Sequence, residues 1–229
     1  MRFDVLTLFP EMIDYVTGQS IIGRAKEKGI ITVNAVDIRD FSQYKSKKVD
    51  DYPYGGGSGM VIMANPVYDA YRSLTKDLKE KPPVVYLTPQ GKPLTQQKVI
   101  SLSELDRIIL LCGHYEGIDE RVIEEIVDDE ISIGDYVVTG GELPALILID
   151  AVSRMLPGVL SGEESFMMES HYDGLLEYPQ YTRPPVFMDK GVPEVLLSGN
   201  HKNIAQWRHE MSVKRTRQKR PDMDKNDNK

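Results

Sequence analysis

The chain has 229 residues, of which 41% are hydrophobic and 28% are charged, and its formal net charge is −7 at pH 7. This composition is typical of a globular protein, and the length suffices for one large domain, alone or with a smaller one. No apolar run reaches the ~18 residues of a membrane span, and the N-terminal segment is too short and too acidic for a signal peptide, so the expected location is the cytoplasm. The negative net charge argues against a uniformly basic nucleic-acid binder.

Predicted strands and helices alternate through the first part of the chain. Residues 3–9 and 30–38 are rich in strand formers, and residues 20–28 favour a helix with Ser20 as its cap and Gly29 as its stop. This alternation favours a mostly parallel α/β sheet.

The alternation continues after a glycine-rich segment. Asn65 is a candidate helix cap, because Pro66 follows at the first helical position. Residues 83–87 favour a short strand that ends in a Thr-Pro-Gln-Gly loop, and Thr95 is expected to cap a helix over residues 96–104.

Residues 50–59, with the sequence DDYPYGGGSG, form the glycine-rich segment. A flexible linker would explain the glycines. A functional loop beside a pocket would explain them equally well and would also account for Tyr52 and Tyr54.

Three glycine-bearing loops follow apolar segments between residues 108 and 144. The first loop begins at Gly113, the second at Gly134, and the third carries Gly140 and Gly141. Open α/β sheets bind ligands at the carboxyl ends of their strands, and glycine lets the backbone approach a ligand closely. The spacing is not G-x-G-x-x-G and no P-loop lysine follows, which disfavours dinucleotide and phosphate-loop sites. We therefore predict a pocket lined by main chain, with simple tight turns as the alternative.

Cysteine and histidine usage predicts neither a disulfide nor a metal site. The only cysteine, Cys112, lies in an apolar run, so a buried and unreactive thiol is expected. The four histidines, at positions 114, 171, 201 and 209, show no repeated ligand spacing.

The last third of the chain favours a long helix, a linker and a smaller domain. Residues 142–156 are apolar but carry Arg154, which is either functional or reaches past the helix end to solvent. Residues 161–173 lack periodicity and favour a linker. From Leu175 a small domain is expected, with a helix over residues 203–217.

The predicted C-terminal helix has one apolar face and a basic flank. Its apolar residues Ile204, Trp207 and Met211 are expected to form a core rather than a base-stacking surface. The basic residues from 202 to 220 are Lys202, Arg208, Lys214, Arg215, Arg217, Lys219 and Arg220, against the single acid Glu210. Such a cluster fits phosphate binding, although a solvated helix face is the commoner origin.

Six motifs, in order along nearly the whole chain, resemble one family. They are LTLFPEM at 6–12, VDDYPYGGGSGMV at 49–61, GHYEGIDER at 113–121, DEISIGDYVVTGGELPA at 129–145, GLLEYPQYTRP at 174–184 and VLLSGNHKNIAQWR at 195–208. Together they resemble the bacterial tRNA (guanine-N1)-methyltransferases, the TrmD family of SPOUT, or trefoil-knot, methyltransferases.

The resemblance implies a fold and a set of partners. The expected fold is α/β, with a mostly parallel sheet, a deep C-terminal trefoil knot and a small helical C-terminal domain. Residues 1–160 would form the knotted S-adenosylmethionine-binding domain, residues 161–174 a flexible linker, and residues 175–229 a helical tRNA-binding domain with a disordered tail. The implied partners are tRNA and a second copy of the chain, whose C-terminal domain closes over the cofactor pocket of the first. Neither a membrane nor DNA is expected as a partner.

The implied reaction transfers a methyl group from S-adenosylmethionine to N1 of guanosine-37, beside the tRNA anticodon. That nitrogen carries a proton, so a base must remove it, and the negative charge that develops on O6 must be stabilised. Arg154 is the candidate cation. The family has an aspartate five residues before Gly-Leu-Leu, where this chain has Glu169, the preferred base. Glu164 and Asp173 remain alternatives, and His171 is a weaker one.

The resemblance also implies that the main chain holds most of the cofactor. The positions carried over by motif are Leu87, Pro89, Gly113, Tyr115, Glu116, Gly117, Ile133, Gly134, Asp135, Tyr136, Val137, Val138, Gly140, Gly141 and Pro144. Lys214, Arg215 and Arg217 are the candidate tRNA contacts. Family members have been linked to magnesium, for which Glu116 is the candidate contact.

Two other functions remain open. The chain could be a knotted methyltransferase that acts on another RNA. It could also be an RNA-binding protein that keeps the cofactor pocket with weakened catalysis, an alternative motivated by Glu169.

Overall fold

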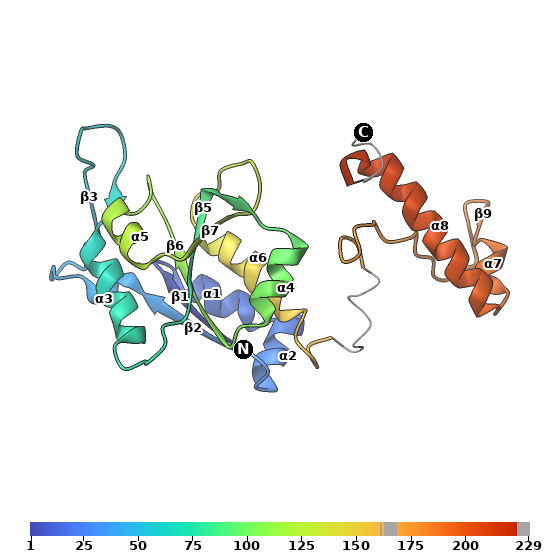
Figure 1. Cartoon of the computed structure of the whole chain (residues 1–229), viewed down its shortest axis with the longest axis horizontal. Coiled ribbons are helices and arrows are strands. Elements are labelled where there is room, and N and C mark those ends of the chain that lie inside the picture. Colours follow the sequence, from blue (N-terminus) through green and yellow to red (C-terminus); the bar gives the residue numbers. More distant parts are fainter. Residues whose placement is uncertain (161, 163–168, 224–229) are drawn as a thin grey trace. The chain divides into compact units, whose positions relative to one another are not determined.

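The computed structural model describes residues 1–160, 162 and 169–223. The chain divides into two compact units, Met1–Ser161 and Gly162–Lys229 (Figure 1). Glu164, one of the candidate bases, lies outside the described residues.

A parallel sheet forms the centre of the first unit. Within residues 1–160 its strands are β1 (Arg2–Thr7), β2 (Thr32–Asp37), β5 (Val84–Pro93), β6 (Arg107–Cys112) and β7 (Asp129–Ser132). Their spatial order is β2-β1-β6-β5-β7, and each neighbouring pair is parallel. The predicted parallel sheet is thus confirmed, and its strands all end at the same edge.

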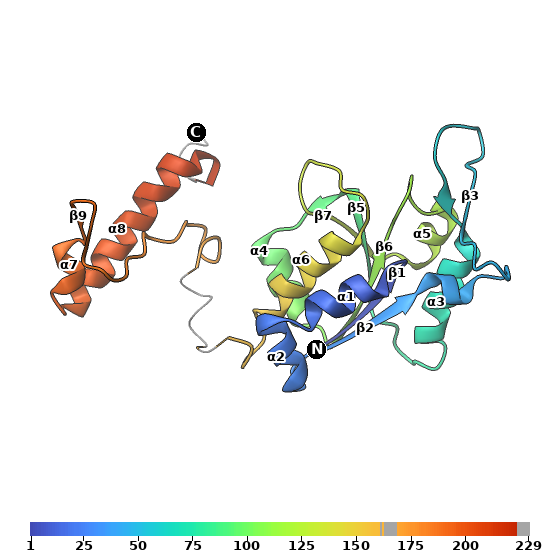
Figure 2. The ribbon, with the colours of Figure 1, turned by 180° about the vertical axis from the view of Figure 1, so that it is seen from behind.

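Helices cover both faces of this sheet (Figures 1 and 2). Ile108, Leu110 and Cys112 of β6 join the core on one face, and Ile109 and Leu111 join the core on the other. The first face is covered by α1 (Pro10–Thr17), α2 (Ser20–Glu27), α4 (Gln96–Ser103) and α6 (Glu142–Ser153), and the second by α3 (Ala64–Thr75) and α5 (Glu120–Ile126). The central strand β6 is therefore apolar from Ile108 to Cys112, as a parallel strand buried on both faces requires.

Two of the predicted helix caps are wrong. Ser20 is the first residue of α2 and Gln19 occupies the cap position, whereas Asn65 lies inside α3 and Met63 occupies its cap position. Neither cap side chain accepts a hydrogen bond from its helix. We attribute both starts to packing of the apolar helix faces on the sheet, which contributes more to helix stability than a cap.

Thr95, by contrast, caps α4 as predicted, and its hydroxyl accepts a hydrogen bond from the Lys98 amide at 3.2 Å. Helix α1 follows β1 closely and was not predicted, because Phe9 occupies its cap position and no capping side chain marks its start.

Strand β5 extends beyond the predicted residues 83–87 and is interrupted. Leu87 and Lys92 both pair with Ile131 of β7, so the Thr-Pro-Gln-Gly loop leaves the sheet between them. Gly91 closes this loop against β7, where a Cβ would lie 2.5 Å from the Glu130 carbonyl carbon. The loop therefore projects at the carboxyl edge of the sheet.

Three shorter elements complete the first unit: η1 (Ile38–Phe41), β3 (Asp50–Asp51) and β4 (Val61–Ile62). The last two pair antiparallel and hold the base of the glycine-rich loop.

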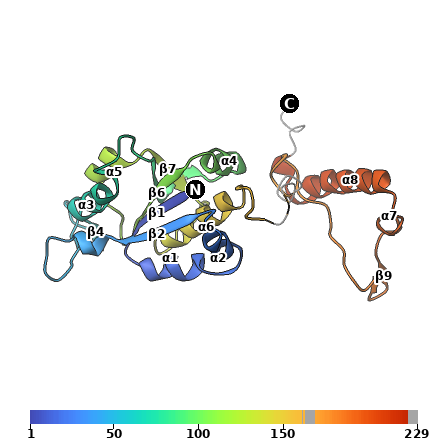
Figure 3. The same cartoon turned by 90° about the horizontal axis from the view of Figure 1, so that it is seen from below.

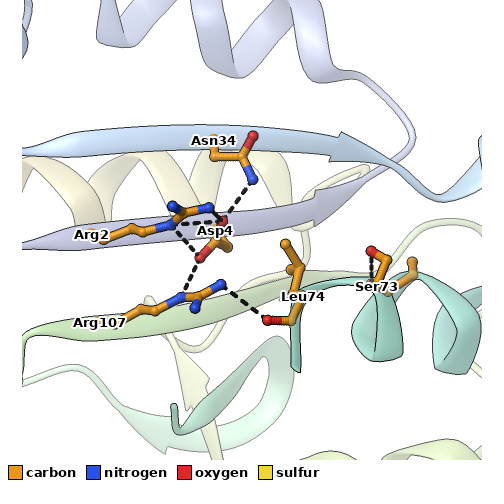
Figure 4. Close-up of polar contacts among 7 residues, drawn as sticks. Arg2, Asp4, Asn34, Ser73, Leu74 and Arg107 are labelled. Carbon is orange, nitrogen blue, oxygen red and sulfur yellow. Dashed lines mark hydrogen bonds and ion pairs between the residues drawn. The ribbon is translucent and has the colours of Figure 1, made fainter. Parts of the chain in front are cut away.

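A buried carboxylate joins three strands near their amino ends (Figure 4). Asp4 of β1 is fully buried, and its carboxylate accepts hydrogen bonds from Arg2 Nη2 at 2.8 Å, Arg107 Nε at 2.7 Å and Asn34 Nδ2 at 2.6 Å. Arg107 also donates to the Leu74 carbonyl at the end of α3. Burial raises the pKa of the Asp4 carboxyl, but the hydrogen bonds from Arg2, Asn34 and Arg107 outweigh it and hold the pKa below its usual value.

Replacing Asp4 with asparagine is expected to lower the free energy of unfolding by about 3 kcal/mol at pH 7, the low end for breaking a buried ion pair. Because the folded-state pKa lies below the unfolded value of 3.8, the charge stabilises the fold above about pH 4 and stops doing so as the pH falls through the folded-state pKa. Denaturant unfolding between pH 3 and pH 7 measures this, with Asp69→Asn on the exposed face of α3 as control. A difference between wild type and Asp4→Asn that stayed constant across this range would contradict the assignment.

The second unit contains a long basic helix (Figure 3). Its described elements are β8 (Val186–Phe187), β9 (Lys190–Gly191), α7 (Glu194–Leu197), α8 (His201–Lys219) and η2 (Pro221–Met223). Helix α8 is longer than predicted, and Asn200 caps it by accepting a hydrogen bond from the Asn203 amide. Its predicted core residues Ile204, Trp207 and Met211 are half-buried. No helix in the described part of either unit is long and apolar enough to cross a bilayer.

Candidate functional site

A cavity of about 240 Å³ lies at the carboxyl edge of β5, β6 and β7. It is lined by Tyr86, Leu87, Thr88, Pro89, Gln90, Gly113, His114, Tyr115, Glu116, Gly117, Ile131, Ser132, Ile133, Tyr136, Val137, Val138, Thr139, Gly140, Gly141 and Pro144. These residues come from the loops after three neighbouring strands and from the start of α6. The cavity therefore occupies the position where open parallel sheets bind ligands.

The cofactor residues predicted from the motifs converge on this cavity. Each of them lines it except Gly134 and Asp135. Those two lie in a turn held by Ser132, whose hydroxyl donates to the Gly134 carbonyl at 2.9 Å and accepts from the Gly134 amide at 3.1 Å. Gly134 takes a φ of 146° there, which residues with a side chain rarely adopt.

Gly140 and Gly141 allow two chain segments to come very close together. A Cβ on Gly140 would lie 2.5 Å from Glu142 Oε2 and 2.7 Å from His114 Nδ1. A Cβ on Gly141 would lie 2.6 Å from the Cα of Cys112. The Gly141 amide donates to the Gly113 carbonyl at 2.8 Å. The third loop is thus fastened directly to the end of β6, and a side chain at Gly141 would force the two segments apart.

Several lining residues were not predicted. Thr88 and Gln90 belong to the Thr-Pro-Gln-Gly loop, from which only Pro89 was selected. That whole loop leaves the sheet after an apolar strand, and this position in the sequence could have marked all of its residues as candidates for the cavity lining. The others are Tyr86, His114, Ile131, Ser132 and Thr139.

The cavity carries little charge. Among the described residues that line it, Glu116 is the acid, and none is lysine or arginine. Burial, followed by the charge of Glu130, raises the pKa of Tyr86 to about 12. The phenol therefore stays neutral at physiological pH and can act as a hydrogen-bond donor. Such a lining suits a neutral or cationic ligand better than a phosphate.

His114 and Glu142 contribute polar groups on either side of Gly140. Glu142 is 4% exposed, and Thr7 Oγ1 donates to its carboxylate at 2.7 Å. His114 lines the cavity, and its Nδ1 is buried without a hydrogen-bond partner among the described residues. Cys112 beside them is buried, and burial together with the Glu142 charge raises the pKa of its thiol well above the usual value, which agrees with the predicted unreactive thiol.

The glycine-rich loop contacts the edge of this cavity. A Cβ on Gly59 would lie 2.3 Å from Glu116 Oε1, and the Glu116 amide donates to the Met60 carbonyl at 3.0 Å. Tyr52 and Tyr54 are 78% and 98% exposed and line a separate open groove of about 910 Å³. The loop is therefore attached at its base to the cavity while its tyrosines stay in solvent.

The structure does not bring Arg154 to this cavity within one chain. Gly141 and Pro144 line the cavity at the start of α6, whereas Arg154 is the C-cap of the same helix. A helix rises about 1.5 Å per residue, so roughly 20 Å separate the two ends.

Glu169 and the candidate tRNA contacts lie in the second unit. Glu169 is half-buried, and its carbonyl accepts a hydrogen bond from the Tyr172 amide in a turn that leads to Asp173. The segment after this turn is bound to α8, because Thr216 Oγ1 accepts from the Leu176 amide at 2.9 Å.

The three candidate tRNA contacts lie along α8. Lys214 and Arg217 are exposed, whereas Arg215 is half-buried and donates to the Glu177 carbonyl. No group of three or more His, Cys, Asp or Glu residues that could hold a metal occurs among the described residues.

Comparison with known proteins gives consistent matches over the whole length. The family model described as tRNA (Guanine-1)-methyltransferase TrmD matches residues 1–226. A tRNA (guanine-N(1)-)-methyltransferase of Ruminiclostridium cellulolyticum is 63% identical over 223 residues, which cover 97% of this chain and 96% of the relative. A protein of the same name from Clostridioides difficile is 58% identical over 229 residues, which cover 100% of this chain and 99% of the relative. Another from Lachnospira eligens is 56% identical over 223 residues, which cover 97% of this chain and 94% of the relative.

Proposed function

Since the chain belongs to the tRNA (guanine-1)-methyltransferase TrmD family, its activity is methyl transfer to N1 of a guanine in tRNA, and we propose that the donor is S-adenosylmethionine and the acceptor guanosine-37. The observation that carries the proposal is the cavity at the ends of β5, β6 and β7, which gathers the glycine loops of the family motifs.

The lining of the cavity fits S-adenosylmethionine in shape and charge. Glycines 113, 140 and 141 leave main-chain groups exposed, which can read the neutral polar edges of an adenine. Glu116 suits the positive charge of the donor, whereas a phosphate would meet no cation in this lining.

The proposed chemistry divides between the donor and two side chains. S-adenosylmethionine supplies an electrophilic methyl group. Glu169 would accept the N1 proton of guanine, which makes that nitrogen nucleophilic, and Arg154 would stabilise the charge that develops on O6. Neither side chain lines the cavity of its own first unit, so the reaction requires that they be delivered to it.

A methyl-transfer assay on tRNA transcripts tests the function. Radiolabelled methyl from S-adenosylmethionine is expected to enter a transcript with guanosine at position 37, and not one with adenosine there. Equal labelling of both transcripts would refute the proposed acceptor, and labelling of neither would refute the proposed activity.

A second copy of the chain would bring Arg154 to the cavity. Apart from Glu142 and Asp150, the residues of helix α6 are apolar or small, a composition that favours burial. Leu143 and Ile147 are nevertheless each 47% exposed, on the face that also carries the exposed Asp150. Tyr15 and Val16 of the contacting helix α1 are also exposed. If two copies pack α6 against α6 antiparallel about a two-fold axis, Arg154 of one copy lies beside the cavity of the other. We therefore propose a homodimer with composite active sites.

Ile147→Glu is expected to dissociate this dimer. Burying one unpaired carboxylate per copy costs several kcal/mol, so the dissociation constant should rise by more than roughly a hundredfold. Sedimentation equilibrium at micromolar concentration measures the effect. Leu78→Glu, a matched change at an exposed leucine away from α6, should remain dimeric. A dimer of undiminished affinity in Ile147→Glu would exclude this face as the interface.

The proposal includes three further properties that family membership implies: a trefoil knot, tRNA binding by the second unit and a location in the cytoplasm. The trefoil knot is supported by the fastening of the loop at residues 139–141 to the end of β6. Binding of tRNA by the second unit is supported by Lys214, Arg215 and Arg217 on α8. Its place of action would be the cytoplasm, where tRNA is modified.

Magnesium is not assigned a resident site. Glu116 is a single carboxylate, which suffices only for an ion that arrives with waters or phosphates of the substrate.

A further inference from the structure

The second unit contains a pocket that the methyl-transfer reaction does not use. It measures about 340 Å³, and its walls include Tyr178, Tyr181, Arg183, Leu197 and Arg208. This volume lies within the range of about 300–1,000 Å³ that is typical of small-molecule sites. Its lining combines apolar and aromatic side chains with two guanidinium groups, and among the described lining residues none is acidic.

Arg208 is held in this wall by an aromatic ring rather than by an acid. Its guanidinium carbon lies 4.7 Å from the centroid of the Tyr178 ring, a cation–π distance. Its Nε is buried and has no hydrogen-bond partner among the described residues. A buried N–H donor without an acceptor is costly. Arg208 as a whole is only partly buried and lines the pocket, so its guanidinium can donate to a ligand that brings an acceptor.

Tyr181 supplies an available aromatic surface. Its side chain is 48% exposed, and its ring centroid lies 6.3 Å from that of Trp207. Unpaired bases of RNA bind by stacking on aromatic rings and by hydrogen bonds to their edges, and arginine suits both base edges and phosphates. Helix α8, which holds Trp207, also carries Lys214, Arg215 and Arg217, and these residues extend the positive charge beyond the pocket.

We infer that this pocket binds one unpaired nucleotide of the tRNA, other than the methylated guanosine. The base stacks on Tyr181, the guanidinium of Arg208 donates to an acceptor on the nucleotide, and Arg183 neutralises its phosphate. This inference rests on the proposed function, because it takes tRNA as the substrate. It adds a second point of recognition, which would hold the tRNA while the guanosine reacts elsewhere.

Steady-state methylation by the full-length enzyme tests the inference. Tyr181→Leu is expected to raise KM for tRNA about tenfold, as loss of one stacked base would, and to leave kcat nearly unchanged. Tyr181→Trp should retain the wild-type KM, because it preserves an aromatic face. Arg208→Gln should also raise KM. Circular dichroism confirms that each variant is folded.

Trp207 provides an independent reading, because it is the only tryptophan of the chain. A uridine pentanucleotide, which has no guanine to methylate, is expected to quench its fluorescence in wild type and in Lys190→Gln, a change at an exposed lysine of the second unit that does not line the pocket. Quenching should be lost in Tyr181→Leu and weakened in Arg208→Gln.

The inference would be overturned if Tyr181→Leu kept the wild-type KM and the wild-type quenching. It would also be overturned if Trp207 fluorescence changed with protein concentration but not with added RNA, a result that would indicate a second copy of the chain in the pocket. Normal methylation with either result would leave the proposed function intact, whereas absence of methylation by the wild type would refute that function instead.

Discussion

Replacing Arg154 with alanine is expected to reduce kcat by roughly 10²–10³-fold, the usual effect of removing one group that stabilises developing charge. The affinity for S-adenosylmethionine should stay close to that of the wild type, because the proposed partner of Arg154 is O6 of the guanine and not the methyl donor. Single-turnover methylation and calorimetric titration measure the two quantities separately. Arg154→Lys should recover part of the rate, since it restores the charge without the planar guanidinium.

Complementation between two inactive variants decides whether Arg154 acts across the dimer. In Gly140→Val the added side chain collides with Glu142 and His114, which should close the cavity. Mixed dimers of Gly140→Val and Arg154→Ala contain one intact cavity facing one intact Arg154 if the site is composite. Co-expression should then restore activity that neither variant has alone. Failure to restore activity in verified mixed dimers would place Arg154 in the site of its own chain.

Glu169→Gln should lower kcat by about 10²–10⁴-fold, the range for loss of a general base. The amide cannot accept the N1 proton but keeps the size of the side chain, so tRNA affinity should change little. The deficit should shrink as the pH rises towards the pKa of guanine N1, because solvent base then removes the proton. Rates measured under single-turnover conditions across this pH range provide the check.

Glu169→Asp separates the role of the carboxylate from its reach. Aspartate is one methylene shorter, and a misplacement of about 1 Å can change a rate roughly a hundredfold. We expect this variant to be active, because the resembling family has aspartate at the position. Glu164→Gln and Asp173→Asn serve as comparison variants. Full activity of Glu169→Gln together with loss of activity in one of them would transfer the base assignment to that residue.

Local sequence patterns predicted the parts of the site that depend on backbone. Each apolar run of the sheet is followed by a loop, and parallel strands end at one edge, so the glycine loops had to meet there. The motif at residues 113–121 and the Thr-Pro-Gln-Gly loop consequently reach one cavity. The Thr95 cap was predictable for a similar reason, because a side-chain cap bonds to an amide only three residues away.

Contacts between distant segments had no such signature and emerged only in the folded chain. Asp4 gave no sign of being a buried ion-pair centre, because its partners Asn34 and Arg107 lie 30 and 103 residues away. Gly140 and Gly141 could have been turn residues, and only the proximity of Cys112 and His114 shows that they permit close packing. The sequence placed Arg154 and Pro144 on one helix, but the cavity opens at the far end from Arg154. Periodicity records which residues share a face, whereas the identity of the neighbour across a contact depends on how the whole chain packs.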